Sequence, residues 1–385
     1  MIENLIQSCA VKAFSSLYSA DVAEDKIIIQ QTRKDFEGDY TINVFPFLKL
    51  TREKPEVCAQ KIGDYLRKHT PEIKSCNVIK GFLNIVVHDT YWTNSLYDNI
   101  MRKNFGEMEK SGDKPIVIEF SSPNTNKPLH LGHIRNNLLG WSVAEILKAA
   151  GQEVEKVNLV NDRGIHICKS MLAWEKWFKG KTPESENIKG DKLVGDCYVR
   201  FDKELKDEIG KLVFAGLDKD RAEQDASLIQ EAREMLKSWE ENDPEVRALW
   251  SRMNEWVYEG FDKTYERLGI DFDKIYYESD TFLLGKDIVE QGLALGVLFK
   301  KEDGSVWADL SDEGLDEKLL LRADGTSVYM TQDLGTAQLR YDDFQPGKLL
   351  YVVGNEQNYH FEVLRIILKK LGRKWAEHIV HISYG

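Results

Sequence analysis

The spacing of apolar and polar residues changes at about residue 110 and divides the chain into two predicted domains. Over residues 1–110, short extended runs alternate with helical periodicity, which predicts a small α+β unit. Its expected elements are a helical opening, strands at 26–30 and 40–44, a helix after Pro55 and a last strand at 81–87. The polar residues 110–115 then read as a linker.

The second predicted domain, residues 111–385, alternates strands with helices. Its mostly apolar runs at 116–120, 156–160 and 348–353 predict strands. This alternation favours a parallel sheet with crossover helices, that is, a doubly wound, Rossmann-like α/β fold.

A stretch from about 170 to 268 interrupts this alternation with charged residues and tryptophans at helical spacing. We interpret it as a helical insertion into the sheet domain. Charge patterns on helices mostly mark solvated faces, so the favoured interpretation is a surface layer without chemistry of its own. Beyond it, Asp303-Gly304 and Asp324-Gly325 predict two hairpin turns, the second between strands at 319–321 and 327–329.

Composition narrows the class of protein. The 385 residues are 42% hydrophobic, which is enough for packed cores, and the net charge of -12 argues against a chain that coats nucleic acid. Five cysteines without a C-x-x-C pair indicate neither a disulfide framework nor a zinc site. The start of the chain has no basic leader and no run approaches a membrane span, so we expect a cytoplasmic protein without a membrane partner.

Polar clusters follow three of the predicted strands, at 121–133, 161–164 and 354–360. Ligands of open parallel sheets bind at the carboxyl ends of the strands, which predicts one shared cleft. In the first cluster His130 and His133 flank Gly132 at an expected helix start, where free N–H groups and the helix dipole attract phosphate. The pattern H-x-G-H alone is a weak signal, but no G-x-G-x-x-G or Walker A motif competes with it.

Several motifs in this order resemble the arginyl-tRNA synthetase family, which belongs to the class I synthetases. The motifs in the second domain are Ser121 to Asn136, Val160-Asn161-Asp162, Tyr329 to Asp333 and Val352 to Gln357. In the first domain, Phe36 to Tyr40 and Gly81 to Asn84 resemble the additional N-terminal domain of that family, which contacts tRNA.

The resemblance implies a two-step reaction. L-Arginine attacks the α-phosphate of ATP to form arginyl-adenylate and pyrophosphate, and tRNA(Arg) then accepts the arginyl group. The implied catalytic residues are Lys127, His130 and His133, and the implied ATP-binding residues are Pro128, His130, Gly132, His133 and Gly354. Mg²⁺ would arrive with ATP, no tightly bound protein metal is expected, and we expect a monomer.

The resemblance also implies which residues bind arginine: Asn124, Asp162, Glu278, Tyr329, Asp333 and Gln357. A guanidinium group has five donors and requires carboxylate and carbonyl acceptors. Outside this context Asp333 reads as a helix-start residue and Tyr329 as a half-buried strand residue, and Asp162 fits an Asx turn equally well.

Two departures from the family pattern matter. Gln332 stands where the family often has arginine. No Lys-Met-Ser-Lys-Ser-like loop and no all-helical anticodon-binding domain is recognised, so we expect an N-terminal fragment that binds substrates but is impaired in catalysis. The alternatives are a nucleotidyltransferase that shares the H-x-G-H motif, and a non-catalytic module that binds RNA through residues 1–110.

Overall fold

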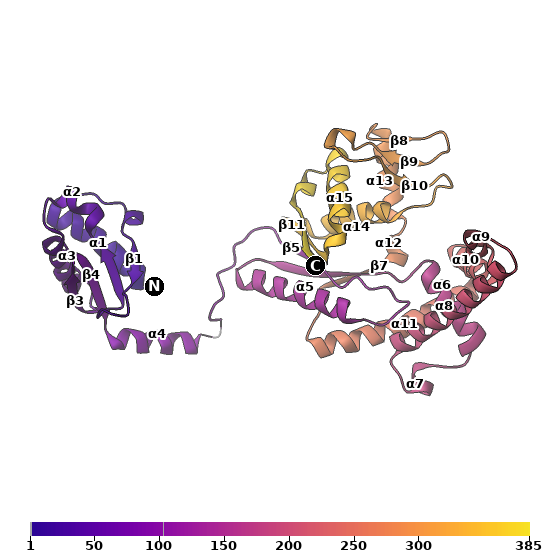
Figure 1. Ribbon diagram of the computed structural model, residues 1–385, viewed down its shortest axis with the longest axis horizontal. Helices are drawn as coiled ribbons and strands as arrows, with labels where there is room; N and C mark the ends of the chain where they lie inside the picture. Colours follow the sequence, from indigo (N-terminus) through magenta and orange to yellow (C-terminus); the bar gives the residue numbers. More distant parts are fainter. Residues whose placement is uncertain (1, 103) are drawn as a thin grey trace. The chain divides into compact units, whose positions relative to one another are not determined.

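The computed structural model describes residues 2–102 and 104–385 (Figure 1). Contacts between Cα atoms divide the chain into two compact units, residues 1–106 and 107–385. No helix of the described residues is long and apolar enough to cross a membrane.

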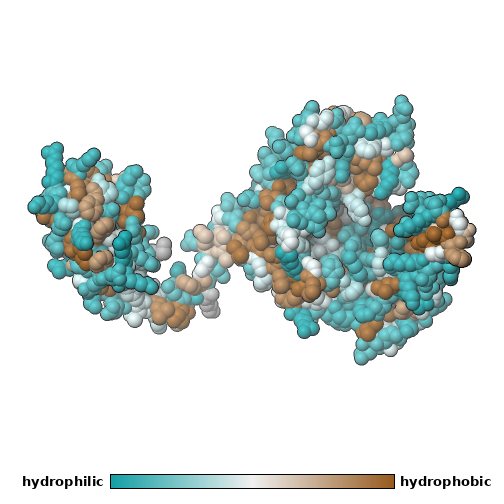
Figure 2. All heavy atoms as spheres, in the orientation of Figure 1, coloured by the Kyte–Doolittle hydropathy of each residue, from teal (hydrophilic) through white to brown (hydrophobic). Residues whose placement is uncertain are grey.

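The first unit packs helices on a four-stranded antiparallel sheet of order β1-β2-β4-β3. Its elements are α1 (Ile2–Tyr18), β1 (Ile29–Gln31), β2 (Tyr40–Asn43), α2 (Leu48–Thr51), α3 (Pro55–His69), β3 (Ile73–Ile79), β4 (Phe82–Val87) and α4 (Asp89–Met101). The core includes Phe14, Ile42 and Leu83. Helix α4 buries none of its residues, and its exposed apolar side chains are visible as brown spheres in Figure 2.

Two expectations for this unit need correction. Lys26 lies in a 3-10 turn (Glu24–Lys26), and the strand begins only at Ile29. Strand β3 was not predicted, because polar Lys74, Ser75 and Asn77 interrupt its apolar pattern. It is an edge strand that pairs only with β4, so one side of its backbone is free to face water.

The second unit is built on a five-stranded parallel sheet of order β12-β11-β5-β6-β7. The strands are β5 (Ile116–Glu119), β6 (Val154–Val160), β7 (Lys274–Tyr277), β11 (Lys348–Gly354) and β12 (Ile379–Tyr384). The chain proceeds from β5 to one side of the sheet and later returns to the other side, next to β5. The topological switch point therefore lies between β5 and β11, as the doubly wound prediction requires.

Alternate residues of the central strands enter two separate cores. Ile116, Ile118 and Phe120 pack with α5 (Leu131–Ala149) and with the helices inserted after β6. Val117, on the opposite face, packs with the helices that follow β7. Because both faces are covered, most residues of these strands are apolar, which explains why they could be predicted; the polar exceptions Glu119, Lys156 and Asn158 are buried.

The stretch between β6 and β7 is a layer of helices, drawn in magenta to orange in Figure 1. It comprises α6 (Ile165–Ala173), a π-helical turn (Trp174–Phe178), α7 (Pro183–Glu186), α8 (Gly190–Phe214), α9 (Lys219–Asp225), α10 (Ser227–Glu240) and α11 (Pro244–Leu268). The layer buries Phe201, Trp239 and Phe261, and Phe201 and Phe261 belong to the same core as Ile118 of β5, so the layer packs on the sheet as well as having a charged surface.

The segment between β7 and β12 contains a small antiparallel sheet and four helices. Its elements are α12 (Glu278–Thr281), α13 (Leu284–Ala294), β8 (Leu298–Lys300), β9 (Val306–Ala308), β10 (Lys318–Leu321), α14 (Tyr329–Phe344) and α15 (Asn358–Lys370). The hairpin at Asp303-Gly304 is confirmed.

The second predicted hairpin is only partly formed. The chain turns at Asp324-Gly325, but its far side pairs through a single bridge, Leu321 to Ser327. Tyr329 begins helix α14 instead of continuing a strand. The physical reason is that Met330, Leu334 and Ala337 are buried at helical spacing, which outweighs pairing with β10.

Candidate functional site

The chain leaves β5 through a strained turn. Ser121 and Ser122 both have positive φ, 75° and 43°, a conformation that costs residues other than glycine about 1–3 kcal/mol each. Buried amides hold the turn: Ser121 N–H donates to Asn136 Oδ1 (2.6 Å) and Ser122 N–H to Asn158 Oδ1 (3.0 Å). The Ser121 hydroxyl also lies 2.7 Å from the hydroxyl of Tyr265 in α11. The turn directs the following loop toward the start of α5.

The two histidines close the first turn of α5. The Gly132 N–H donates to Nδ1 of His130 (3.1 Å), and the His130 N–H donates to Nδ1 of His133 (3.2 Å). A backbone N–H can only donate, so both Nδ1 atoms are acceptors and each neutral ring carries its proton on Nε2. The ring centroids lie 4.0 Å apart, which brings two Nε2–H donors to the helix start.

Two further features set the charge of the His133 ring and the position of the His130 ring. Burial, with smaller effects from His130 and Lys127, lowers the pKa of His133 to about 4, so this imidazole is neutral at pH 7. A Cβ atom on Gly132 would lie 2.9 Å from Cε1 of His130 and would displace that ring. The glycine is therefore needed for the geometry of the pair.

The segments that follow β5 and β6 lie side by side and are linked by backbone hydrogen bonds. The Thr125 N–H donates to the carbonyl of Asn161 (3.0 Å), and the Asn161 N–H donates to that of Pro123 (2.9 Å). Next to this bridge lies a pocket of about 220 Å³. The pocket is lined by Asn124, Asn161, Arg163, Gly164, Ile165, His166, Ile167, Glu278, Arg322, Ser327, Val328, Tyr329 and Gln332.

Glu278 provides the carboxylate of this pocket. It begins α12, and its Oε1 accepts a hydrogen bond from Gln332 Nε2 (2.9 Å). Burial raises the pKa of Glu278, while Arg163 and the Gln332 hydrogen bond oppose that shift. Arg163 is itself paired with Glu240 (2.6 Å) and lies over the Phe282 ring. Gln332 orients the carboxylate without adding a positive charge.

The structure brings together only part of the predicted arginine-binding set. Asn124, Glu278 and Tyr329 line the pocket, and Tyr329 is 78% exposed. Asp162 is buried and does not line the pocket. Burial raises the pKa of its carboxyl, while hydrogen bonds from Ser279 and Tyr258 oppose that shift. Asp333 pairs instead with His360 Nε2 (2.6 Å).

The remaining predicted residues lie at the end of β11 or in the loop between β5 and α5. Gln357 is exposed in the 3-10 turn that follows β11. Pro128 packs closely on Gly195 of α8, where a Cβ would lie 2.6 Å from the proline ring. Lys127 is near enough to lower the pKa of both His133 and His166. At Gly354, the last residue of β11, a Cβ would meet the Glu356 carboxylate at 2.6 Å.

Three cationic or titratable residues that line the pocket, Arg163, His166 and Arg322, were not among the predicted site residues, although Arg163 lies in the polar cluster 161–164. His166 lines the pocket, and its Nδ1 lies 3.0 Å from the Tyr198 hydroxyl. The available signal was position, because Arg163 and His166 directly follow the Asn161-Asp162 strand end.

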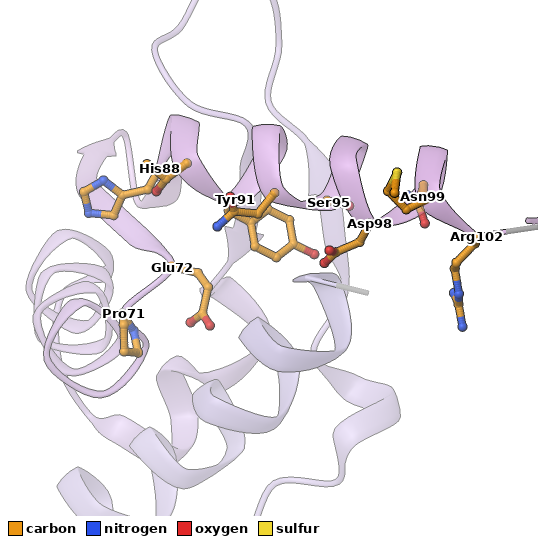
Figure 3. Close-up of a pocket in the computed structure, with 11 residues that line it drawn as sticks. Pro71, Glu72, His88, Tyr91, Ser95, Asp98, Asn99 and Arg102 are labelled. Carbon is orange, nitrogen blue, oxygen red and sulfur yellow. The ribbon is translucent and has the colours of Figure 1, made fainter.

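The first unit has pockets of its own. A pocket of about 780 Å³ lies beside α4, and Figure 3 shows Glu72, Tyr91 and Asp98 directed toward it. It is larger than the pocket at Glu278, but none of the predicted site residues lines it. A second pocket, of about 220 Å³, is lined by Gln30, Gln31, Arg33, Phe36, Thr41, Ile79, Lys80, Phe82 and Asn84. In the described part of the chain, no group of three or more His, Cys, Asp or Glu residues is placed to hold a metal ion.

Comparison with known families accounts for both units. Residues 96–385 match the family described as tRNA synthetases class I (R), catalytic domain. Residues 2–87 match the arginyl tRNA synthetase N terminal domain.

Individual relatives agree with the family matches. The chain is 56% identical to the arginine–tRNA ligases of Amoebophilus asiaticus and Bacteroides fragilis, over 100% of its own length and 64% of theirs. Among solved structures, it resembles arginyl-tRNA synthetase from Thermus thermophilus (TM-score 0.57, 20% identity) over 100% of this chain and 66% of that one. The corresponding enzyme from Plasmodium falciparum has a TM-score of 0.58 at 18% identity, over 100% and 65%.

Proposed function

Because the chain belongs to the arginyl-tRNA synthetase family of class I tRNA synthetases, we propose that it forms the arginine-activating part of an arginine–tRNA ligase. The arginine carboxylate attacks the α-phosphorus of ATP, the bond to the β-phosphate oxygen breaks, and pyrophosphate leaves. The arginyl group then passes from the adenylate to tRNA(Arg). The observation that carries this proposal is that the pocket containing the Glu278 carboxylate lies at the same sheet edge as two histidine Nε2–H donors.

The histidine pair would stabilise the triphosphate. His130 and His133 present Nε2–H donors beside the α5 N-terminus, whose dipole adds a partial positive charge. Lys127 supplies a full charge, and Pro128, Gly132 and Gly354 let ATP approach the backbone. Fixed donors that match charge developing on the phosphate lower the barrier without covalent chemistry. Mg²⁺ would be held by phosphate oxygens and water.

Glu278 would bind the guanidinium group. One of its oxygens is oriented by Gln332, and the carboxylate retains acceptor sites for a forked donor. Asn124 and Tyr329 line the same pocket and would bind the polar end of arginine. Asp333 and Gln357 are proposed to join them, since a carboxylate that is bonded to His360 still has free lone pairs.

The first unit would contact tRNA. The pocket at Phe36 and Phe82 combines two rings that are 40% and 42% exposed with the cations Arg33 and Lys80. Exposed aromatic rings stack on unpaired bases, and cations bind the phosphate backbone. The pocket beside α4 is less suited to RNA, because it contains the carboxylates Glu72 and Asp98.

Calorimetric titration of this chain with arginine, lysine and citrulline tests the proposal, with and without a non-hydrolysable ATP analogue. We expect arginine to bind most tightly, and Glu278→Gln to weaken arginine by about tenfold or more, as for loss of a charged hydrogen bond. Citrulline has the length of arginine without its charge. Equal binding of all three amino acids would remove the case for an acidic arginine pocket.

We also propose a monomer that acts in the cytoplasm. Cys9, Cys58, Cys168 and Cys197 are buried as free thiols, which suits a reducing compartment. Sedimentation at increasing concentration would test the oligomeric state, and a rising mass would contradict a monomer.

A further inference from the structure

Asp162 is not among the residues that line the pocket, and its carboxylate is hydrogen-bonded within the protein. Its side chain is 1% exposed. Oδ1 accepts from the Ser279 N–H (2.8 Å), while Oδ2 accepts from the Ser279 hydroxyl (2.7 Å) and the Tyr258 hydroxyl (2.9 Å). Three of the roughly four acceptor positions of the carboxylate are therefore filled by groups of the protein itself.

Helix α11 holds the backbone of the same residue. The carbonyl oxygen of Asp162 accepts from Trp250 Nε1 (2.6 Å) and Asn254 Nδ2 (3.2 Å). Trp250, Asn254 and Tyr258 are spaced four residues apart and therefore share one face of α11. One face of an inserted helix thus fixes both the main chain and the side chain of Asp162.

Asp162 is also connected, through Ser279, to Glu278, the carboxylate of the pocket. Ser279 directly follows Glu278, and both stand in the first turn of α12, whose N–H groups have no partner within the helix. Asp162 binds one of these N–H groups from another element and acts as a cap for that turn. The position of the Glu278 backbone therefore depends on Asp162.

We propose that Asp162 is a positioning residue through which α11 holds Glu278 in place, and that it does not itself bind arginine. This inference rests on the proposed function, in which Glu278 binds the guanidinium group. It gives the helical layer a role in specificity, in place of the surface layer without chemistry that its charge pattern suggests.

A double-mutant cycle tests this assignment. Arginine affinity is measured by calorimetry for wild type, Asp162→Asn, Glu278→Gln and the double variant. We expect each single variant to bind about tenfold more weakly, and the double variant to resemble Glu278→Gln alone, because Asp162 acts through Glu278. Losses that multiply in the double variant would overturn the proposal, as would full affinity of a folded Asp162→Asn.

A second ligand separates positioning from direct contact. 5-Guanidinopentanoate lacks the α-amino group of arginine but keeps the guanidinium. If Asp162 bound the α-amino group, Asp162→Asn would not weaken this analogue. We expect the same fold-loss for the analogue as for arginine, and an unchanged analogue affinity would contradict the assignment.

If Asp162→Asn does not fold, a variant that removes a single hydrogen bond to Asp162 provides the test. Tyr258→Phe removes one donor to Asp162 and leaves both bonds from Ser279. We expect a loss in arginine affinity of about three- to tenfold. The matched control is Tyr277→Phe, whose ring lies 5.1 Å from that of Tyr258, and it should bind arginine as wild type does.

Equal effects of Tyr258→Phe and Tyr277→Phe on arginine affinity would overturn the proposal. Failure of wild type to bind arginine would instead refute the proposed function itself.

Discussion

The histidine pair at the start of α5 is held by hydrogen bonds between sequence neighbours, whereas Glu278 is held from distant parts of the chain. The bonds at His130 and His133 span two and three residues. Those that fix Asp162, which is bonded to Ser279 next to Glu278, span 88 to 117 residues. The first side of the site therefore forms with its helix, and the second exists only after the inserted helices have packed.

The two sides of the site also differ in how deeply their residues are buried. His130 is exposed, and Asp162 is almost completely buried. A lost hydrogen bond at an exposed helix start is replaced by water, while a buried donor without a partner keeps its full desolvation penalty. Substitutions on the histidine side should thus affect ligands, and those on the Asp162 side should affect stability as well.

The largest effect is expected for Asp162→Ala. It leaves the Ser279 N–H and the Tyr258 hydroxyl without a partner in a buried site, which should lower the free energy of unfolding by about 3 kcal/mol. Urea denaturation measures this change. Asp262→Ala removes an exposed carboxylate of α11 and should cost less than about 0.5 kcal/mol. Similar losses in both variants would contradict a special role for Asp162.

Gly132→Ala should produce a smaller effect that is confined to ATP. The new methyl group displaces the His130 ring, which should weaken an ATP analogue by about tenfold, or about 1.4 kcal/mol. Gly210→Ala in α8 is the control, because a Cβ there meets nothing within 4 Å. Calorimetry and a thermal melt would measure both variants. Unchanged ATP affinity in Gly132→Ala would show that the ring position does not matter.

The smallest effect concerns the pH dependence of stability. The folded pKa of His133 is about 4, below the usual value of 6.5, so the unfolded chain binds the proton more readily. Wild type should therefore lose stability relative to His133→Gln as pH falls from 6.5 to 4. Because the ring is partly solvated, we expect a change of at most about 1 kcal/mol. Urea denaturation across this range measures it, and a relative gain of stability in acid would have the wrong sign.

The same contrast explains what the sequence could predict. Strands 116–120, 156–160 and 348–353 were predicted because burial on both faces makes most of their residues apolar. The histidine pair was recognised because all its contacts lie within one short motif. The start of helix α14 was predicted as the end of a strand, since Tyr329 follows a turn that also suits a hairpin.

Long-range contacts account for what was missed. Whether Asp162 is a ligand or a support depends on Tyr258, which is 96 residues away and lies in a helix whose charge pattern suggests a surface layer. Periodicity identifies a buried face but not its partner, so the role of α11 could not be predicted from the sequence.

The most direct test of the account measures arginine and an ATP analogue separately against Gly132→Ala and Tyr258→Phe. If the two sides of the site are held independently, Gly132→Ala should weaken only the ATP analogue and Tyr258→Phe should weaken only arginine. Equal losses for both ligands in both variants would contradict the account, because they would show that the two sides are positioned as one unit.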